Sequence, residues 1–380
     1  MSRLLHFSIL MGIFSALIWG CLKRDLSDYP GYLDPEHVRL FAYPGEWWEG
    51  HDVAEMPDGR YVATGVRDFA GDSMRTAIVV VSSSGDSLGV FYINDRARGV
   101  NVVSLSGDRV AVENTKKTYI VSPTDGSIEG SLEFSNFRVL DSENDALIYD
   151  SSSNSLITPW RDDGLCLHQV FLDGSDGWLA CSGVEAWLVS VKRARDGYVV
   201  QGAKPGRVLL FKVNTEGEVK WVRVVDIPFA DTTDAQVVEV DGFEITDDGS
   251  FLLPMDQGSL TPVLLKIDTL GNILWIKNYE HPGGGIDWLR VYTFKVVRIA
   301  PERYFLVATN AQCGHCVSVI KIDGDGNVLM AKNYFWAYFH WVWNVIRTSD
   351  GNILIVGTSA EDSTNSLFLL KLDPNGNPVW

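Results

Sequence analysis

The second half of the chain repeats one sequence unit four times. Each copy reads as an apolar run with a lysine, a short polar stretch that contains Gly, and a second run that ends at Trp in three of the copies. The lysines are Lys212, Lys266, Lys321 and Lys371, so successive copies are 54, 55 and 50 residues apart. This spacing is close to the period of a β-propeller blade, and each unit reads as strand, glycine turn, strand.

A second recurring element precedes the first. Asp58-Gly, Asp196-Gly, Asp248-Gly and Asp350-Gly are each followed by a short apolar run. Together the two elements predict an all-β protein, a seven-bladed β-propeller of four-stranded blades. The predicted blades span residues 53–91, 101–132, 137–171, 187–225, 237–279, 294–334 and 345–380, of which the third is the most divergent.

The segment 37–43 has the character of an outer strand without a blade of its own, because it is similar to 273–279 in sequence. We expect it to pair with the last blade near 367–372, since an unpaired edge would expose a row of backbone donors and acceptors. The ring would then be closed by an N-terminal strand, although residues 378–380 compete for the same edge.

The first 20 residues have a basic start at Arg3, an apolar stretch, and Ile18-Trp-Gly-Cys21 at the end. This segment resembles a bacterial lipoprotein signal, which implies cleavage before Cys21, acylation of Cys21 and, with Leu22 next, sorting to the outer membrane. Trp19 is bulky for that motif, so an uncleaved membrane anchor is the alternative. The predicted organisation is a signal peptide over 1–20, a tether over 21–36 and a single propeller domain over 37–380, monomeric and facing the periplasm or the cell surface.

The charge balance of the chain excludes some classes of binding partner. The chain has 32 basic and 49 acidic residues, a net charge of -17. An acidic surface repels phosphate backbones and anionic headgroups. We therefore expect no nucleic-acid partner, and contact with the membrane only through the acyl anchor.

The repeats, Asp-Gly followed by Leu-Lys-Ile-Asp-x-x-Gly-Asn-x-x-Trp, resemble those of secreted bacterial seven-bladed propellers, and the Gly-x-x-x-Trp endings are similar to the docking motif of quinoprotein-like propellers. The resemblance covers residues 186–380 well and 45–171 weakly. These motifs define architecture and not chemistry. Quinoprotein enzymes also need adjacent cysteines in the channel, which this chain lacks, so no cofactor is expected.

The cysteines predict two disulfides. Cys313-Gly-His-Cys316 has the spacing of a redox dithiol, but it falls between two predicted strands, where no helix would activate a thiolate. A disulfide across this hairpin is favoured over a metal site with His315 and over redox catalysis. In an oxidising compartment we expect Cys166 and Cys181 to pair as well.

The remaining motifs indicate neither a metal site nor a catalytic site. Asp323-Gly-Asp-Gly-Asn327 has the oxygen spacing that opens a calcium loop, yet a hairpin turn explains it, so no metal site is predicted. No catalytic motif is present, and no catalytic residue is assigned. His51 with Asp52, and Asp287 near His281, are the least implausible acid–base groups.

Aromatic residues give the strongest functional signal. The loops that enter the inner strands carry many of them, including the run 334–343, and these loops share one rim of a propeller. These aromatic residues could serve either of two roles. They pack between neighbouring blades, or they form an exposed platform that binds a sugar or a peptide. The predicted binding residues are Trp47, Trp48, Trp288, Trp336 and Trp341.

Two function classes follow. The favoured class is a non-catalytic cell-envelope lipoprotein whose propeller rim binds a glycan, a peptide or a partner protein. The alternative class is a propeller enzyme that acts on carbohydrate or uses a quinone cofactor.

Overall fold

The computed structural model describes residues 31–42, 46–69, 74–95, 97, 99–132, 147–162, 164–228, 242–256, 261–283, 286, 289–361 and 364–380. Within these ranges the regular secondary structure consists of β-strands and the short 3-10 helices η2 (Pro35–His37) and η3 (Ala311–Cys313). No helix in the described part of the chain is long and apolar enough to cross a membrane. Residues 1–20 and Cys21, on which the predicted signal peptide and lipidation site fall, lie outside the described residues.

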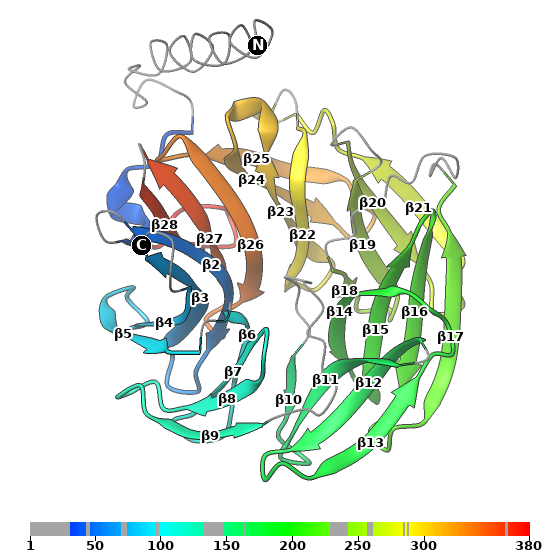
Figure 1. Cartoon of the computed structure of the whole chain (residues 1–380). Helices are drawn as coiled ribbons and strands as arrows, with labels where there is room; N and C mark the ends of the chain where they lie inside the picture. The colour runs from blue at the N-terminus through cyan, green and yellow to red at the C-terminus, as the bar shows by residue number, and fades with distance from the viewer. Residues whose placement is uncertain are drawn as a thin grey trace, which may run out of the picture.

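Five antiparallel four-stranded sheets follow one another around a central axis, as the ring in Figure 1 shows. Their strands are rich in β-branched and aliphatic residues and alternate with turns at Gly, Asp and Asn, as the repeats predict. The strands are β6 (Gly99–Ser104), β7 (Val110–Asn114), β8 (Thr118–Val121) and β9 (Ile128–Leu132); β10 (Ile148–Asp150), β11 (Ser155–Asp162), β12 (Gly164–Phe171) and β13 (Asp176–Cys181); β14 (Trp187–Ala194), β15 (Gly197–Lys204), β16 (Arg207–Val213) and β17 (Val219–Asp226); β18 (Glu244–Ile245), β19 (Phe251–Asp256), β20 (Pro262–Ile267) and β21 (Ile273–Asn278); and β22 (Val291–Ala300), β23 (Arg303–Asn310), β24 (Cys316–Asp323) and β25 (Val328–Tyr334).

The remaining strands form one eight-stranded sheet with the order β26-β27-β28-β2-β3-β4-β5, in which β1 also pairs with β28. Its members are β26 (Phe339–Arg347), β27 (Ile353–Glu361), β28 (Thr364–Leu372), β1 (Arg39–Phe41), β2 (Glu46–Glu55), β3 (Tyr61–Phe69), β4 (Arg75–Val81) and β5 (Ser87–Ile93).

The all-β propeller with four-stranded blades is confirmed, but the prediction of seven separate blades is not. The structure has five separate four-stranded sheets, and it joins the strands predicted for the first and last blades in one sheet. The joint is a single parallel pair between Trp47 of β2 and Asn365 of β28. It arises because β2 begins at Glu46, seven residues before the predicted start of the first blade, and its early residues reach β28.

The N-terminal strand pairs where it was predicted to pair. In β1, Arg39, Leu40 and Phe41 lie opposite Leu369, Phe368 and Leu367 of β28. The C-terminal segment continues along the same edge, because the Val379 amide donates to the Lys371 carbonyl at 2.9 Å. Contact with the propeller begins before the predicted domain start at position 37, since the Leu33 amide donates to the Phe335 carbonyl at 2.9 Å and the Leu33 side chain is buried.

Core residues lie between neighbouring groups of four strands. In the described part of the chain they form seven clusters, each shared by two successive groups around the ring. The repeated Gly–Trp element serves this packing. A Cβ added to Gly326 would lie 2.9 Å from the ring of Trp275, which belongs to the preceding sheet, so only glycine lets the Trp pack this closely. The packing role predicted for this Trp is confirmed.

The two repeated elements also contact each other. The lysine of the Leu-Lys-Ile-Asp element forms an ion pair with the Asp of the Asp-Gly turn in three repeats. The pairs are Lys212–Asp196, Lys266–Asp248 and Lys371–Asp350. The repeat therefore encodes a charge pair inside each of these sheets as well as a turn.

Candidate binding site at the channel mouth

β-Bulges mark the inner strands at one end of the channel. A bulge places two residues of one strand opposite one residue of the partner strand. One side chain then departs from the regular alternation between the two faces of the sheet. Five inner strands contain one, between Gly50 and Asp52, Gly99 and Asn101, Leu188 and Ser190, Val291 and Thr293, and Val342 and Asn344.

The residue after each bulge is polar and buried, so the bulges build a polar ring inside the channel wall. The ring consists of Asp52, Asn101, Ser190, Thr293 and Asn344. Asp52 is the most heavily bound member. Its carboxylate accepts from the Val53 amide at 2.7 Å, the Val102 amide at 2.7 Å and the Asn344 Nδ2 at 2.6 Å.

Three bulged residues, His51, Tyr292 and Trp343, take part in a continuous aromatic stack. We call this stack, with His315, Phe339 and Trp341, the aromatic cluster. His51 stacks on Trp343 with 5.1 Å between ring centroids, and Trp343 lies 5.7 Å from Trp341. Trp341 stacks on Tyr292 at 5.3 Å, and Tyr292 stacks on His315 at 4.8 Å.

Phe339 lies 4.5 Å from His315 between ring centroids and also stacks on Trp341 at 6.1 Å. Phe339 is the first residue of β26 and Tyr292 the second of β22, so the cluster lies where the inner strands enter the channel. His51 is buried, whereas Tyr292, His315, Phe339, Trp341 and Trp343 are all partly exposed.

Hydrogen bonds fix one end of the cluster. Glu49 accepts from the Trp47 indole at 2.8 Å, and its second oxygen lies 3.2 Å from His51 Nε2. The Trp343 indole donates to the Thr358 hydroxyl at 3.0 Å. These rings are therefore held in place in the structure before any ligand arrives.

The other end is built from the Cys313–Cys316 disulfide loop. Gly314 and His315 have φ values of 73° and 68°, a left-handed pair that turns the His315 ring onto Tyr292. The His315 carbonyl accepts from the His340 amide at 2.9 Å and lies 3.0 Å from His340 Nδ1. The loop is thus clamped to β26.

The two histidines of this clamp are held neutral. Burial lowers the pKa of His315 below its usual value. Burial also lowers the pKa of His340 to about 3, against a small opposing effect of the His315 carbonyl. Burial penalises the charged imidazolium more than the neutral ring, so the position between Tyr292 and Phe339 favours the uncharged form of His315.

The second disulfide joins Cys166 and Cys181, with 2.06 Å between the sulfurs. It links the neighbouring strands β12 and β13, where the two residues are direct register partners. Neither disulfide is part of a metal cluster, since no group of three or more metal-ligating side chains occurs among the described residues.

The calcium-like segment is a hairpin turn, as predicted. Asp323 Oδ1 accepts from the Asp325 amide at 3.1 Å and from the Asn327 amide at 2.8 Å. Asp268 and Asp373 bind their own turns in the same way. The carboxylate oxygens are therefore used inside the turn.

Two of the five predicted Trp residues cannot form a rim platform. Trp48 is fully buried and packs beside Tyr92, because neighbouring residues on a strand point to opposite faces and Trp47 takes the outward position. Trp336 is 3% exposed and packs edge-on against Phe368 at 4.9 Å. The prediction that these two contribute to an exposed surface is wrong.

The other three have different outcomes. Trp341 belongs to the aromatic cluster, and Trp47 is 50% exposed beside Glu49. Trp288 and Asp287 lie outside the described residues. Sequence reasoning missed Tyr292, His315 and Phe339 as members of one site. The alternation of Phe339 and Trp341 was a usable signal, but nothing local connects them to Tyr292 or His315.

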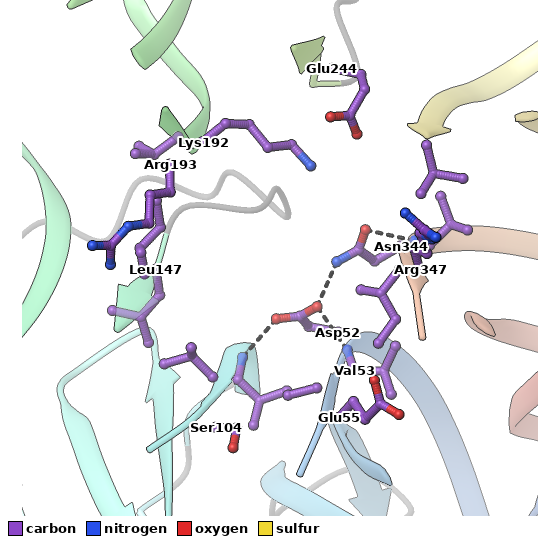
Figure 2. A pocket seen from close by; sticks show the side chains of 18 of the residues that line it. Asp52, Val53, Glu55, Ser104, Leu147, Lys192, Arg193, Glu244, Asn344 and Arg347 are labelled. Carbon is purple, nitrogen blue, oxygen red and sulfur yellow. Dashed lines mark hydrogen bonds between the residues drawn. The ribbon is translucent and has the colours of Figure 1, made fainter. Parts of the chain in front are cut away.

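The channel also contains a cavity of about 520 Å³, lined by residues from all of the inner strands. Figure 2 shows Asp52 bound to Asn344 and to the two backbone amides at one side, with Lys192, Glu244 and Arg347 around the open space. Glu55, another lining residue, accepts from the Ser349 amide at 2.6 Å and from its hydroxyl at 2.7 Å.

The chain matches no family model and no curated protein. Solved structures share its fold. The WD40 repeats of RRP9 align with a TM-score of 0.62 at 12% sequence identity, over 90% of this chain and 98% of that chain. Streptogramin B lyase aligns with a TM-score of 0.56 at 10% identity, over 87% of this chain and 96% of that one. At these identities the likeness establishes the class, an all-β propeller, and nothing about chemistry.

Proposed function

We propose that this chain is a non-catalytic binding propeller of the bacterial cell envelope, and that the aromatic cluster is its ligand contact. One observation carries the proposal: six aromatic rings in mutual contact, from three successive groups of strands, stand at one end of the channel, and five of them are partly exposed. Large aromatic side chains dominate the energetics of binding sites. Rings held by Glu49, Thr358 and a disulfide loop lose little entropy on binding.

The ligand classes are a glycan, a peptide or a partner protein, since ring faces and edges suit sugar C–H groups and apolar peptide anchors alike. A binding screen with a glycan array, combined with crosslinking on intact cells, separates these classes. Trp341→Ala and Tyr292→Ala should each weaken binding by about 30-fold or more, because the loss of a central aromatic contact costs upward of ~2 kcal/mol.

Trp221→Ala is the matched control for that experiment. Trp221 lies on the outer strand β17, away from the inner strands that carry the cluster. If the Trp221 variant loses as much affinity as the Trp341 variant, or if neither cluster variant loses any, the aromatic cluster is not the ligand contact.

The alternative function is a propeller enzyme, acting on carbohydrate or using a quinone. It would need free ionisable groups in the channel. Asp52 and Glu55 of the cavity wall are engaged by donors from the protein itself. The buried carboxyl of Glu113, whose pKa is raised to about 7 by burial, is not a cavity-lining group. This arrangement favours binding over catalysis.

The ring itself we interpret as seven-bladed. The eight-stranded sheet would count as two blades joined by the single Trp47–Asn365 pair, with β1 as the outer strand beside β28. The seven inter-sheet core clusters support this count. A high-resolution experimental map would test it directly, by showing whether β2 and β28 diverge beyond that pair.

The location we propose rests on the sequence: Cys21 as an acylated N-terminus that anchors a monomer to the outer membrane, facing the periplasm or the surface. Intact-mass measurement of the membrane form tests this, because an acylated chain that starts at Cys21 has a distinct mass. A chain that starts at Met1 and carries no acyl group would contradict it.

A further inference from the structure

The Cys313–Cys316 disulfide closes the loop that supplies the His315 ring to the aromatic cluster. Its two cysteines differ in exposure. Cys313 is partly exposed and stands between the exposed residues Gln312 and Gly314, whereas Cys316 is fully buried. A reductant in solution therefore approaches the bond from the Cys313 side.

The backbone of this loop decides where the His315 ring lies. His315 has a φ of 68°, in the left-handed region that non-glycine residues rarely adopt, and Gly314 before it has a φ of 73°. His315 Nδ1 is buried and has no hydrogen bond with any described residue. The ring is therefore placed by the backbone and by stacking, with its centroid 4.8 Å from that of Tyr292 and 4.5 Å from that of Phe339.

Backbone hydrogen bonds tie the loop to its surroundings on either side of the left-handed pair. The Ala311 amide donates to the Arg290 carbonyl at 2.7 Å, and the His340 amide donates to the His315 carbonyl at 2.9 Å. Neither bond spans the segment from Cys313 to Cys316. The disulfide does span it, so reduction lets the two left-handed residues relax while both hydrogen bonds remain.

The other disulfide has a different place in the fold. Cys166 and Cys181 are direct register partners in β12 and β13, so backbone pairing keeps them side by side when their bond is broken. Cys313 belongs to the 3-10 helix η3 and not to a strand, while Cys316 is paired with Asn310 in the sheet. Opening of the Cys313–Cys316 bond therefore changes the local backbone more than opening of the other bond.

We propose that the Cys313–Cys316 disulfide is a redox switch for the aromatic cluster, closed in the binding form and opened by a dithiol reductant. A thiolate of the dithiol attacks the Cys313 sulfur, the bond between the two cysteines breaks, and Cys316 leaves as a thiolate that takes up a proton. The second thiolate of the reductant then displaces Cys313, which is protonated in turn. The dithiol ends as a disulfide and has supplied two electrons and two protons.

Reduction should withdraw the His315 ring from Tyr292 and Phe339. Phe339 would keep Trp341, at 6.1 Å between centroids, as its neighbour in the cluster. The site then loses one partly exposed ring and part of the preformed arrangement that lowers the entropic cost of binding. The expected loss of affinity rests on the proposed function, whereas the movement of His315 does not.

NMR of the purified chain with isotope-labelled histidine tests this movement without a ligand. In the oxidised protein the His315 ring signals should carry the ring-current shift of the stacked Tyr292, and dithiothreitol should remove most of it. His315→Gln assigns these signals. His51 stacks on Trp343 and belongs to β2, so its signals should keep their shift and report that the protein is still folded.

Two double variants separate this bond from disulfides in general. Cys313→Ser with Cys316→Ser should reproduce the His315 signals of the reduced wild type. Cys166→Ser with Cys181→Ser is the matched control and should keep the oxidised His315 signals, because the two strands stay paired. The proposal is overturned if His315 keeps its shift in the reduced wild type.

Alkylation of free thiols in mixtures of reduced and oxidised dithiothreitol shows which bond opens first. We expect Cys313–Cys316 to open in the folded protein, before Cys166–Cys181, whose cysteines are held together by strand pairing. If Cys313–Cys316 opens only when the His51 signals show unfolding, the bond is a structural staple and the switch does not exist.

The glycan array and the crosslinking on intact cells are then repeated with both double variants. A signal about tenfold or more weaker for the Cys313 and Cys316 variant than for the Cys166 and Cys181 variant supports control of binding by this bond. If the His315 signals move and the binding signals stay equal, the switch stands and the aromatic cluster is not the ligand contact, which refutes the proposed function instead.

Discussion

Asn344 and Asp52, 292 residues apart in the chain, are joined by a 2.6 Å hydrogen bond from the Asn344 Nδ2 to the Asp52 carboxylate. Both residues follow a β-bulge, one in the last inner strand and one in the first. The bond therefore closes the ring at its centre, while β1 closes it at its edge. The same bulges turn Trp343 and His51 into the aromatic cluster, so closure and the candidate site share one local distortion.

Asp52→Asn should destabilise the protein by about 1–3 kcal/mol, because the Val53 amide, the Val102 amide and the Asn344 Nδ2 all donate to Asp52, and an amide can accept at only one of its two positions. Urea denaturation measures the change. Asp226→Asn is the control, since Asp226 is 78% exposed in a surface ion pair and should change the stability by less than ~1 kcal/mol. Equal midpoints for wild type and Asp52→Asn would contradict this role.

Removal of residues 31–42 should lower the melting temperature by roughly 5 °C or more, as the loss of a few kcal/mol does in a domain of this size. The deletion uncovers the edge of β28 and removes the buried side chains of Leu33 and Val38. Leu40→Ala keeps the strand and changes a 40% exposed side chain, so it should melt like the wild type. A deletion variant with an unchanged melting curve would show that β1 does not contribute to closure.

Gly326→Ala should cost more than Gly351→Ala, although both glycines have positive φ, 75° and 85°. A Cβ at Gly351 meets nothing within 4 Å, so only the left-handed backbone is penalised, by about 1–2 kcal/mol. At Gly326 the Cβ also meets Trp275 at 2.9 Å, which adds about 1–3 kcal/mol of overpacking. Equal losses in chemical denaturation would mean that the Gly–Trp contact carries no packing energy.

The fold could be predicted from the repeats because each copy contains the residues that form its turn and the residues that pack against the neighbouring sheet. The pairing of residues 37–43 with the last strand was also predictable, since a single orphan strand faced a single open edge. The joined sheet was not predictable, because it depends on one contact between Trp47 and Asn365.

The candidate site was harder to predict from the sequence than the fold. Five bulges shift the strand register by one residue, and alternation in the sequence does not reveal where they fall. Trp48 looks like its exposed neighbour Trp47 in sequence and is buried by the alternation of the strand. Trp336 lies in the bend between β25 and β26 and is buried by its tertiary contact with Phe368. Tyr292 and His315 reach the cluster through tertiary packing from a different hairpin.

Lys371→Met should destabilise the protein by about 1–3 kcal/mol, less than for a fully buried pair, because its partner Asp350 is half exposed. Lys371 is buried and donates to Asp350 at 2.6 Å and to the Tyr61 hydroxyl at 2.8 Å. Lys321→Met is the control, since the Lys321 ammonium donates to the Pro374 carbonyl at the surface. A loss no larger than that of Lys321→Met would contradict the structural role of the pair.

The same pair gives a pH dependence. Burial alone would raise the pKa of Asp350, but the hydrogen bonds from Lys371 and Thr348 lower it to about 2. A carboxyl with a depressed pKa contributes stability above its unfolded pKa near 4 and loses that contribution as the pH falls toward 2. Stability between pH 4 and pH 2 should therefore fall more steeply in the wild type than in Lys371→Met.

Glu113→Gln should stabilise the protein at pH 8 and leave it nearly unchanged at pH 4.5. Burial raises the pKa of Glu113 to about 7, although hydrogen bonds from Asn101 Nδ2 at 2.6 Å and Thr158 Oγ1 at 3.3 Å oppose the shift. The folded state therefore binds a proton between pH 4.5 and 7 that the unfolded state has released, and stability falls as the pH rises through this window. Gln can keep its oxygen on Asn101 and direct its amide to the Thr158 hydroxyl, so it replaces the protonated form without a charge.

Above pH 7 the gain should reach roughly 2–3 kcal/mol, measured by urea denaturation across the pH range. If the stability difference between wild type and variant does not change between pH 4.5 and 8, Glu113 has no raised pKa in the folded protein.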